Sequence, residues 1–301
     1  MPHKYFILDV FANKYFAGNP LAVVLDCDDL SNDQMQKITH EFNLSETVFV
    51  CTPQNPSHTA SLRIFTPFEE LDFAGHPTVG AAALIAKQQA QNWPTIAMLT
   101  LEEKIGLIRC AVTISKDSEI TSEFDIPALP YPAHSFGSNQ DIANALGLEP
   151  EDITFENHQP RSFSAGLPFV FVPVRNAAIL NKIIPNITQW EQAFGACTHN
   201  NAFIYTRETL HSECHFQARM LYKGDQIRED AATGSAAAAF SAMINEFDRP
   251  LDGAHHYKVE QGIAMQRPAI ISLEIDVESN QLKKVRIGGN SVVLASGELA
   301  V

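Results

Sequence analysis

The feature that most constrains the fold of this 301-residue chain is a pattern that occurs twice. FAGHPTVGAAALIA (73–86) and AATGSAAAAFSAMI (231–244) each place a glycine and a polar residue at a turn that opens a helix of small residues. The first copy predicts a turn at 73–80 followed by an apolar helix at 81–90. Such helices of small residues allow other backbone to come close.

Two weaker echoes accompany the first. SETVFV (45–50) is similar to GLPFVFV (166–172), and FAGNPLAVVL (16–25) is similar to IGGNSVVLAS (287–296). Together the three echoes predict two similar domains that face each other across a cleft, and a cleft between domains is a favoured place for a ligand. The mixture of expected strands and helices indicates an α/β fold class, and the proline-rich segment 123–139 is the expected linker.

Composition and charge exclude several classes of function. The formal net charge of −14 argues against nucleic acid and against anionic membranes, both of which require basic patches, but not against a small anionic substrate. No signal-peptide pattern and no apolar run long enough to span a bilayer is found. The five cysteines are widely spaced, with no C-x-x-C pair. These features predict a reduced, cytoplasmic protein.

The turn before the second small-residue helix contains Asp230, Thr233, Gly234 and Ser235. These residue types commonly cap a helix N-terminus. Alternatively, the first-turn amides are left open for the negative charge of a ligand. Ser235 has no base nearby in sequence and lies outside any G-x-S-x-G motif, so it is interpreted as a hydrogen-bond donor and not as a nucleophile.

Two residues in the first half could transfer protons. Glu46 precedes an apolar strand, where it is either an exposed edge residue or a carboxylate whose pKa is raised in a partly dry pocket. His76 follows Gly75 and precedes Pro77, which is expected at the first helical position. The histidine either caps its own helix or points into the cleft as an acid, base or donor.

Other chemistries lack support in the sequence. No G-x-G-x-x-G, Walker or H-E-x-x-H motif occurs, which argues against bound nucleotides and against a zinc protease site. The segment HSECH (211–215) resembles a metal motif, but it continues into an expected strand that would hold its two histidines too far apart. We therefore expect neither a bound nucleotide nor a metal ion.

The ordered motifs FAGNP, NLSETVFV, FAGHPTVGAAALI, EDAATGSAAAAF and GGNSVVLASGEL resemble those of the PhzF family of phenazine-biosynthesis-like isomerases over nearly the whole chain. The resemblance implies a diaminopimelate epimerase-like fold, with two pseudo-symmetric domains that each wrap a mixed β-sheet around a central helix. It implies a first domain at 1–122 plus 290–301, a second at 123–289, and an active site in the cleft between them. It also implies an isomerase without a cofactor, often a homodimer.

By the same resemblance, Glu46 moves a proton between carbons of a small carboxylate substrate. The implied supporting catalytic residues are His76, Asp230 and Ser235, and the implied substrate-binding residues are Asn19, Gly75, Thr78 and Gly234. Two positions depart from the family pattern, since Ala231 and Asp72 stand where proline is common. Neither is a proposed catalytic group, although Asp72 adds a negative charge near the expected cleft.

Two alternatives remain open. Amino-acid epimerases of this fold use paired cysteines at the two helix turns, where this chain has His76 and Ser235. The other alternative is a binding protein that holds a small carboxylate without reacting with it. Proton exchange into a bound ligand would separate this binding protein from both enzymes.

Overall fold

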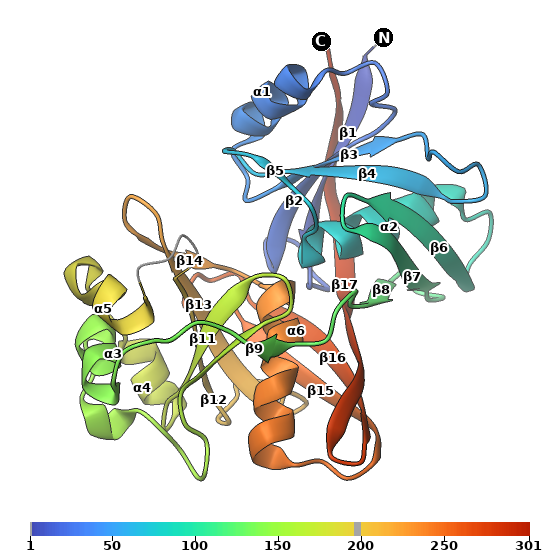
Figure 1. The fold of residues 1–301 in the computed structure, drawn as a ribbon. Coiled ribbons are helices and arrows are strands. Elements are labelled where there is room, and N and C mark those ends of the chain that lie inside the picture. The colour runs from blue at the N-terminus through green and yellow to red at the C-terminus, as the bar shows by residue number, and fades with distance from the viewer. Residues whose placement is uncertain (1, 196–199) are drawn as a thin grey trace. The chain divides into compact units, whose positions relative to one another are not determined.

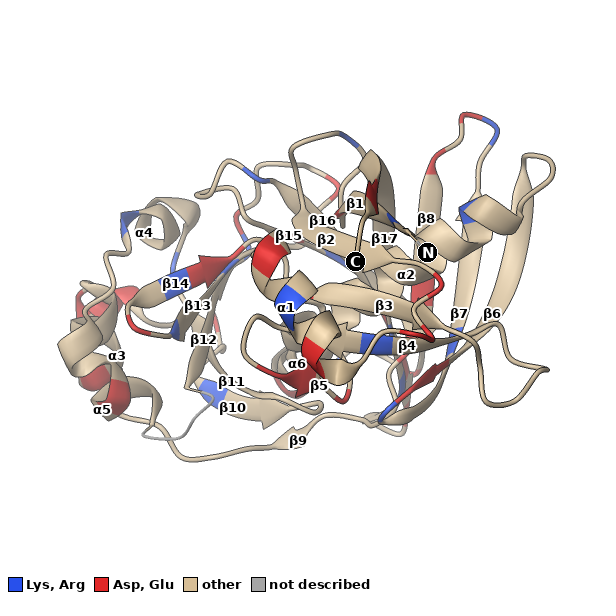
Figure 2. Ribbon diagram, turned by 90° about the horizontal axis from the view of Figure 1, so that it is seen from above, with Lys and Arg blue, Asp and Glu red and all other residues tan. Residues whose placement is uncertain are grey.

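The computed structural model describes residues 2–195 and 200–301. The chain divides into two compact units, which are 1–127 with 288–301 and 128–287 (Figure 1). In the described residues no helix is both long and apolar enough to cross a membrane. Acidic residues occur on elements of both units, so the net charge is not concentrated in one segment (Figure 2).

The first unit is a mixed sheet around one long helix. Its elements are β1 (His3–Val10), β2 (Asn19–Val24), α1 (Asn32–Phe42), β3 (Thr47–Cys51), β4 (Ala60–Phe65), β5 (Glu70–Leu71), α2 (Gly75–Gln89), β6 (Thr95–Glu103), β7 (Gly106–Ile114), β8 (Ile120–Asp125) and the last part of β17 (Gln281–Leu299). β1 pairs antiparallel with β2 and β17, β2 runs parallel to β3, and β4 runs parallel to β6. Strands on several sides contact α2.

The second unit repeats this plan. Its elements are β9 (Tyr131–Pro132), α3 (Asn139–Leu146), β10 (Arg161–Ser164), β11 (Pro168–Pro173), α4 (Ala177–Lys182), α5 (Trp190–Phe194), β12 (Asn201–Thr206), β13 (Phe216–Lys223), β14 (Ile227–Asp230), α6 (Gly234–Met243), β15 (Gly253–Gln261), β16 (Ala269–Glu278) and the first part of β17. Here β10 pairs antiparallel with β11, β11 runs parallel to β12, and β13 runs parallel to β15. These three pairs have the same directions as pairs of the first unit: β10–β11 matches β1–β2, β11–β12 matches β2–β3, and β13–β15 matches β4–β6.

This topology confirms one echo and corrects the other two. The small-residue helices α2 and α6 hold equivalent places, as the first echo predicts. By pairing order, however, β3 corresponds to β12 and β2 corresponds to β11. The expected match of 45–50 with 166–172 is therefore wrong, and the segment 287–296 ends in the first unit, beside β1. Apolar strands resemble one another in composition, so similarity between short segments does not fix their register.

The two central helices are almost completely enclosed. In α2 every residue from Gly75 to Ala86 is buried, and in α6 the same holds for nearly all residues, with Phe240 packed among aromatic rings of the surrounding strands. α2 begins at Gly75, so the predicted turn at 73–80 is wrong from that residue onward. Pro77 lies at the third helical position instead of the first. It is tolerated there because the amides of a first turn have no partner within the helix.

The peripheral and central helices begin differently. α1 and α3 have a capping box, in which Ser31 pairs with Gln34 and Ser138 with Asp141. No side chain caps α2 or α6, whose N-cap residues are Ala74 and Thr233. The predicted epimerase-like plan, a mixed sheet wrapped around a central helix in each unit, is confirmed, and both central helices begin without a side-chain cap.

Candidate active site

In the first unit, Glu46 and His76 come together. Glu46 lies immediately before β3, and His76 is the second residue of α2. The Nε2 atom of His76 lies 3.4 Å from Oε2 of Glu46, and the two side chains are 6% and 18% exposed. Glu46 is therefore largely enclosed and is not an exposed edge residue.

The imidazole of His76 is neutral. Burial lowers the pKa of His76 to about 3, so the contact with Glu46 is not an ion pair at neutral pH. The side-chain amide of Asn19, at the start of β2, donates to Nδ1 of His76 at 3.5 Å. With Nδ1 as acceptor, the ring proton is on Nε2 and faces Glu46. That Nε2 atom is buried and makes no hydrogen bond to any described residue.

The remaining predicted residues of this unit lie in the same helix turn. Gly75 is the first residue of α2, and Thr78 is fully buried three positions later. The hydroxyl of Thr78 is in contact with the carbonyl of Ala74 at 2.7 Å and with the carboxyl of Glu103 at 2.8 Å. Thr78 therefore faces the protein interior and supports the turn. His76 does not cap its helix, so that interpretation is wrong.

The second unit brings Asp230, Gly234 and Ser235 together at the start of α6. Asp230 ends β14, and its Oδ2 accepts a hydrogen bond from the Thr233 hydroxyl at 2.5 Å. Gly234 and the partly exposed Ser235 are the first two residues of α6. The capping interpretation of these residues is not supported, because the N-terminus of α6 has no side-chain cap.

Sequence reasoning missed two buried residues beneath these helix turns. Glu103 ends β6 and contacts Thr78, whereas Gln261 ends β15 and hydrogen-bonds both the amide and the hydroxyl of Thr233. Each ends the strand that follows its unit's central helix. The signal for Glu103 is the alternation along LEE (101–103), where the outer two residues are buried and Glu102 is not, whereas VEQ (259–261) offers no such signal because all three of its residues are buried.

The four cysteines that the structure describes do not form a pair of proton-transfer groups at the two helix turns. Cys27, Cys51, Cys110 and Cys214 are free thiols outside both turns. Burial raises the pKa of Cys51 to about 11 and that of Cys214 to about 12. Thiols with such pKa values supply little thiolate at neutral pH. Cys197 lies outside the described residues.

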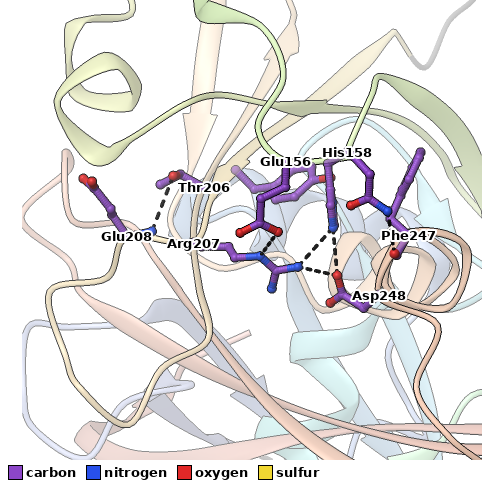
Figure 3. A network of polar contacts seen from close by, with 9 residues as sticks. Glu156, His158, Thr206, Arg207, Glu208, Phe247 and Asp248 are labelled. Atoms are coloured by element: carbon purple, nitrogen blue, oxygen red, sulfur yellow. Dashed lines mark hydrogen bonds and ion pairs between the residues drawn. The ribbon is translucent and has the colours of Figure 1, made fainter.

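Another polar cluster lies beyond the far end of α6. His158 is fully buried, and its Nε2 faces Oδ1 of Asp248 at 2.8 Å, while Arg207 contacts the same carboxylate (Figure 3). Nδ1 of His158 lies 2.7 Å from the Tyr205 hydroxyl. Asp248 belongs to a single π-helical turn, Ile244–Asp248, that continues α6. The cluster thus ties the end of α6 to β12 and to the segment before β10.

Comparisons with known proteins assign the chain to a family. A family model described as phenazine biosynthesis-like protein, PhzC-PhzF, matches residues 8–297. The chain belongs to the PhzF family. It is 44% identical to an uncharacterized isomerase of Mesorhizobium japonicum over 301 residues, with 99% of each chain covered. It is 30% identical to trans-2,3-dihydro-3-hydroxyanthranilate isomerase of Pseudomonas chlororaphis, over 99% of this chain and 100% of that protein.

A solved structure of the same family has the same fold. The phenazine biosynthesis protein of Bacillus anthracis, PhzF family, matches with a TM-score of 0.88 and 26% identity, and all of each chain is covered. The resemblance stated from the motifs is confirmed, and the chain is an isomerase of the PhzF family.

Proposed function

We propose that this isomerase moves a proton between two carbons of a small carboxylate substrate and that Glu46 carries the proton. The observation that supports this most directly is the arrangement at the start of α2. A carboxylate lies 3.4 Å from a buried, neutral imidazole whose Nε2 has no hydrogen bond to a described residue. A base beside an unused buried donor is suited to proton abstraction with stabilisation of the developing negative charge.

The substrate carboxylate is held by backbone amides. A helix N-terminus attracts anions through its free amides and its dipole, and α2 and α6 both begin without a side-chain cap. We propose that Gly75 marks these amides in the first unit and that Gly234 marks them in the second, where Asp230 and Ser235 are the polar side chains beside the helix start. The equivalent construction of the two helix starts supports this assignment.

The reaction then needs no redox partner. Glu46 takes a proton from an acidic carbon, and the electron pair left behind is delocalised into the substrate, where the N-terminus of α2 and His76 stabilise it. The carboxyl proton of Glu46 exchanges with solvent, and Glu46 then returns a proton to a different carbon, so that a double bond changes place and the carboxylate is regenerated. The substrate in the name of the Pseudomonas relative is itself a ring carboxylate, which agrees with this substrate class.

Deuterium exchange tests the proposal. Small cyclic and acyclic carboxylates are incubated with the protein in heavy water, and incorporation into carbon-bound positions is followed by NMR. For wild type we expect exchange into at least one compound, and for Glu46→Gln we expect a loss on the order of 100-fold or more. Glu41→Gln is the matched control, because Glu41 is an exposed carboxylate on α1 and should leave the rate unchanged.

The alternative functions give different results. A binding protein would shift the NMR signals of a carboxylate without exchange, and an epimerase would exchange deuterium only at a stereocentre and invert it. Equal exchange by wild type and Glu46→Gln would contradict the role of Glu46.

A further inference from the structure

The buried carboxyl of Glu103 has no role in the mechanism above, although it adjoins the helix turn that carries His76. Glu103 is 8% exposed at the end of β6, and its Oε1 lies 2.8 Å from Oγ1 of Thr78. Its other oxygen, Oε2, is buried and makes no hydrogen bond to a described residue. A carboxylate in such a place would be a poorly satisfied charge, which is costly.

Counting the protons available around the Thr78 hydroxyl indicates whether the Glu103 carboxyl is protonated or ionised. The Thr78 hydroxyl lies 2.7 Å from the Ala74 carbonyl and 2.8 Å from the Glu103 carboxyl. A hydroxyl has one proton, and the carbonyl can only accept. Both contacts are full hydrogen bonds only when Thr78 donates to Ala74 and a protonated Glu103 donates to Thr78. Ala74 is the N-cap residue of α2, so this chain of donors ends at the start of that helix.

The second unit contains a neutral counterpart at the equivalent place. Ser61 pairs with Glu102 between the parallel strands β4 and β6, and Gln217 pairs with Glu260 between β13 and β15. Glu103 therefore corresponds to Gln261. The Gln261 amide donates to the Thr233 hydroxyl at 3.1 Å and to the Asp230 carbonyl at 2.9 Å. An uncharged donor thus supports the start of α6, which is the role that the proton count assigns to Glu103.

The surroundings favour an uncharged Glu103. Burial raises the pKa of Glu103 to about 8, although the Thr78 hydrogen bond acts in the opposite direction. Cys110 on β7 interacts electrostatically with Glu103, and His76 on α2 lies two positions before Thr78; burial keeps both groups neutral at pH 7.

The adjacent residues of β6 and the following turn do not neutralise Glu103. The Nζ atom of Lys104 lies 3.6 Å from Oε2 of Glu70 and 3.4 Å from Oδ1 of Asp72. The Glu102 carboxylate accepts hydrogen bonds from the backbone amides of Gln54 and Asn55 and from the His58 ring. Within residues 2–195 and 200–301, Glu103 forms no ion pair.

We propose that Glu103 is a positioning residue that acts as a neutral acid, donating to Thr78 and thereby holding the first turn of α2 in place for an anionic ligand. When Glu103 loses its proton it can only accept, so the Thr78 hydroxyl turns toward it and leaves the Ala74 carbonyl with the Thr78 backbone amide as its remaining donor. The new negative charge also opposes an anion at the same helix end. The effect on substrate rests on the proposed function, but the protonation state and its coupling to α2 do not.

Infrared spectroscopy with carboxyl-labelled glutamate tests the protonation state directly. In wild type at pH 6 we expect the carbonyl band of a buried carboxylic acid, which disappears through a titration near pH 8, as the pKa of Glu103 requires. The band should be absent from Glu103→Gln, a variant of nearly the same shape that copies Gln261. In Thr78→Val the band should persist and shift to higher frequency, because the acid has lost its acceptor.

Backbone NMR tests the coupling to α2. The amide signals of Gly75 and His76 should move with the same midpoint as the infrared band in wild type and should stay constant in Glu103→Gln. Glu41→Gln serves again as the control and should behave as wild type. With a substrate from the exchange screen, KM of wild type should rise several-fold above that midpoint while kcat changes little, and Glu103→Gln should abolish the rise.

The outcomes separate this inference from the proposed function. Identical spectra of wild type and Glu103→Gln at pH 6, or a band that Thr78→Val leaves unchanged, would overturn the role of Glu103 whether or not the protein moves protons. A titrating band with coupled amides, in a protein that exchanges no deuterium, would support the role of Glu103 and contradict the proposed function alone.

Discussion

At the residue scale, single side chains in this fold are controlled by burial more than by charge partners. Burial lowers the pKa of His76 to about 3 and raises that of Glu103 to about 8, so both are neutral at pH 7 in the first unit. The sequence indicated His76 through its motif. It did not indicate Glu103, because two adjacent glutamates in LEEKIG suggest a solvated strand end. Only the inward position of every second residue of β6 separates Glu103 from Glu102.

A pH-dependent difference in stability follows from Glu103. Its pKa is about 8 in the folded chain against an ordinary value of 4.5, so the folded state binds the proton more tightly. Its contribution to stability is fully present below pH 4.5 and is lost as the pH rises to about 8. The free energy of unfolding of Glu103→Gln minus that of wild type should therefore increase by up to about 1.4 kcal/mol for each pH unit between pH 4.5 and 8.

Urea unfolding at several pH values between 4.5 and 9 measures this difference. The gap between the two proteins should stop growing above pH 8. Parallel stability curves would show that the carboxyl titrates in the folded chain as it does in the unfolded one.

At the scale of elements, the central helices were recognised from sequence, whereas the strand equivalences were not. A run of alanines before a bulkier apolar residue is a distinctive pattern, and it corresponds to helices that strands surround closely. Strands such as β3 and β11 share an apolar composition without sharing a place in the fold. Their equivalence depends on whether neighbours run parallel, which is a property of the long-range pairing.

We expect the hydrogen bonds of His158 to stabilise the C-terminal end of α6, where Asp248 lies. Removing the ring in His158→Ala leaves the Tyr205 hydroxyl and the Asp248 carboxylate each without one buried partner. We expect a loss of about 3 kcal/mol in the free energy of unfolding. His256→Ala is the control, because that side chain is 74% exposed and should change stability by less than about 0.5 kcal/mol.

Hydrogen exchange locates the effect of His158→Ala. Amides of the π-helical turn Ile244–Asp248 should exchange faster, because Asp248 is held there by His158 and Arg207. Although burial alone would raise the pKa of Asp248, these hydrogen bonds lower it, so the carboxylate stays charged and firmly held. A variant as stable as wild type would show that Arg207 alone holds the turn.

At the scale of the whole molecule, each unit has its own central helix with strands around it, but the first unit is discontinuous in sequence. Its last strand comes from residues 288–301, and β17 pairs with β1 from His3 with Leu299 to Val10 with Ser291. The family motifs extend to this final segment, which is why sequence reasoning could include it. No local periodicity indicates that a C-terminal strand pairs with an N-terminal one.

Truncation tests the importance of this strand. A chain that ends at Ile287 leaves one edge of β1 without the partner that β17 supplies. We expect the first unit to lose its native NMR signals and to become sensitive to protease, while the signals of the second unit persist. Removing only Ala300 and Val301, which follow β17, is the control and should leave both units folded. Native signals of the first unit in the longer truncation would contradict this expectation.

The same strand has a consequence for synthesis on the ribosome. Domains commonly fold in the order in which they emerge, the N-terminal one first. Here residues 1–127 leave the ribosome early but lack their last strand until residues 288–301 have also emerged, whereas residues 128–287 are complete before that. The unit that is begun first is therefore finished last, and the nascent protein must keep β1 from pairing elsewhere until residues 288–301 emerge.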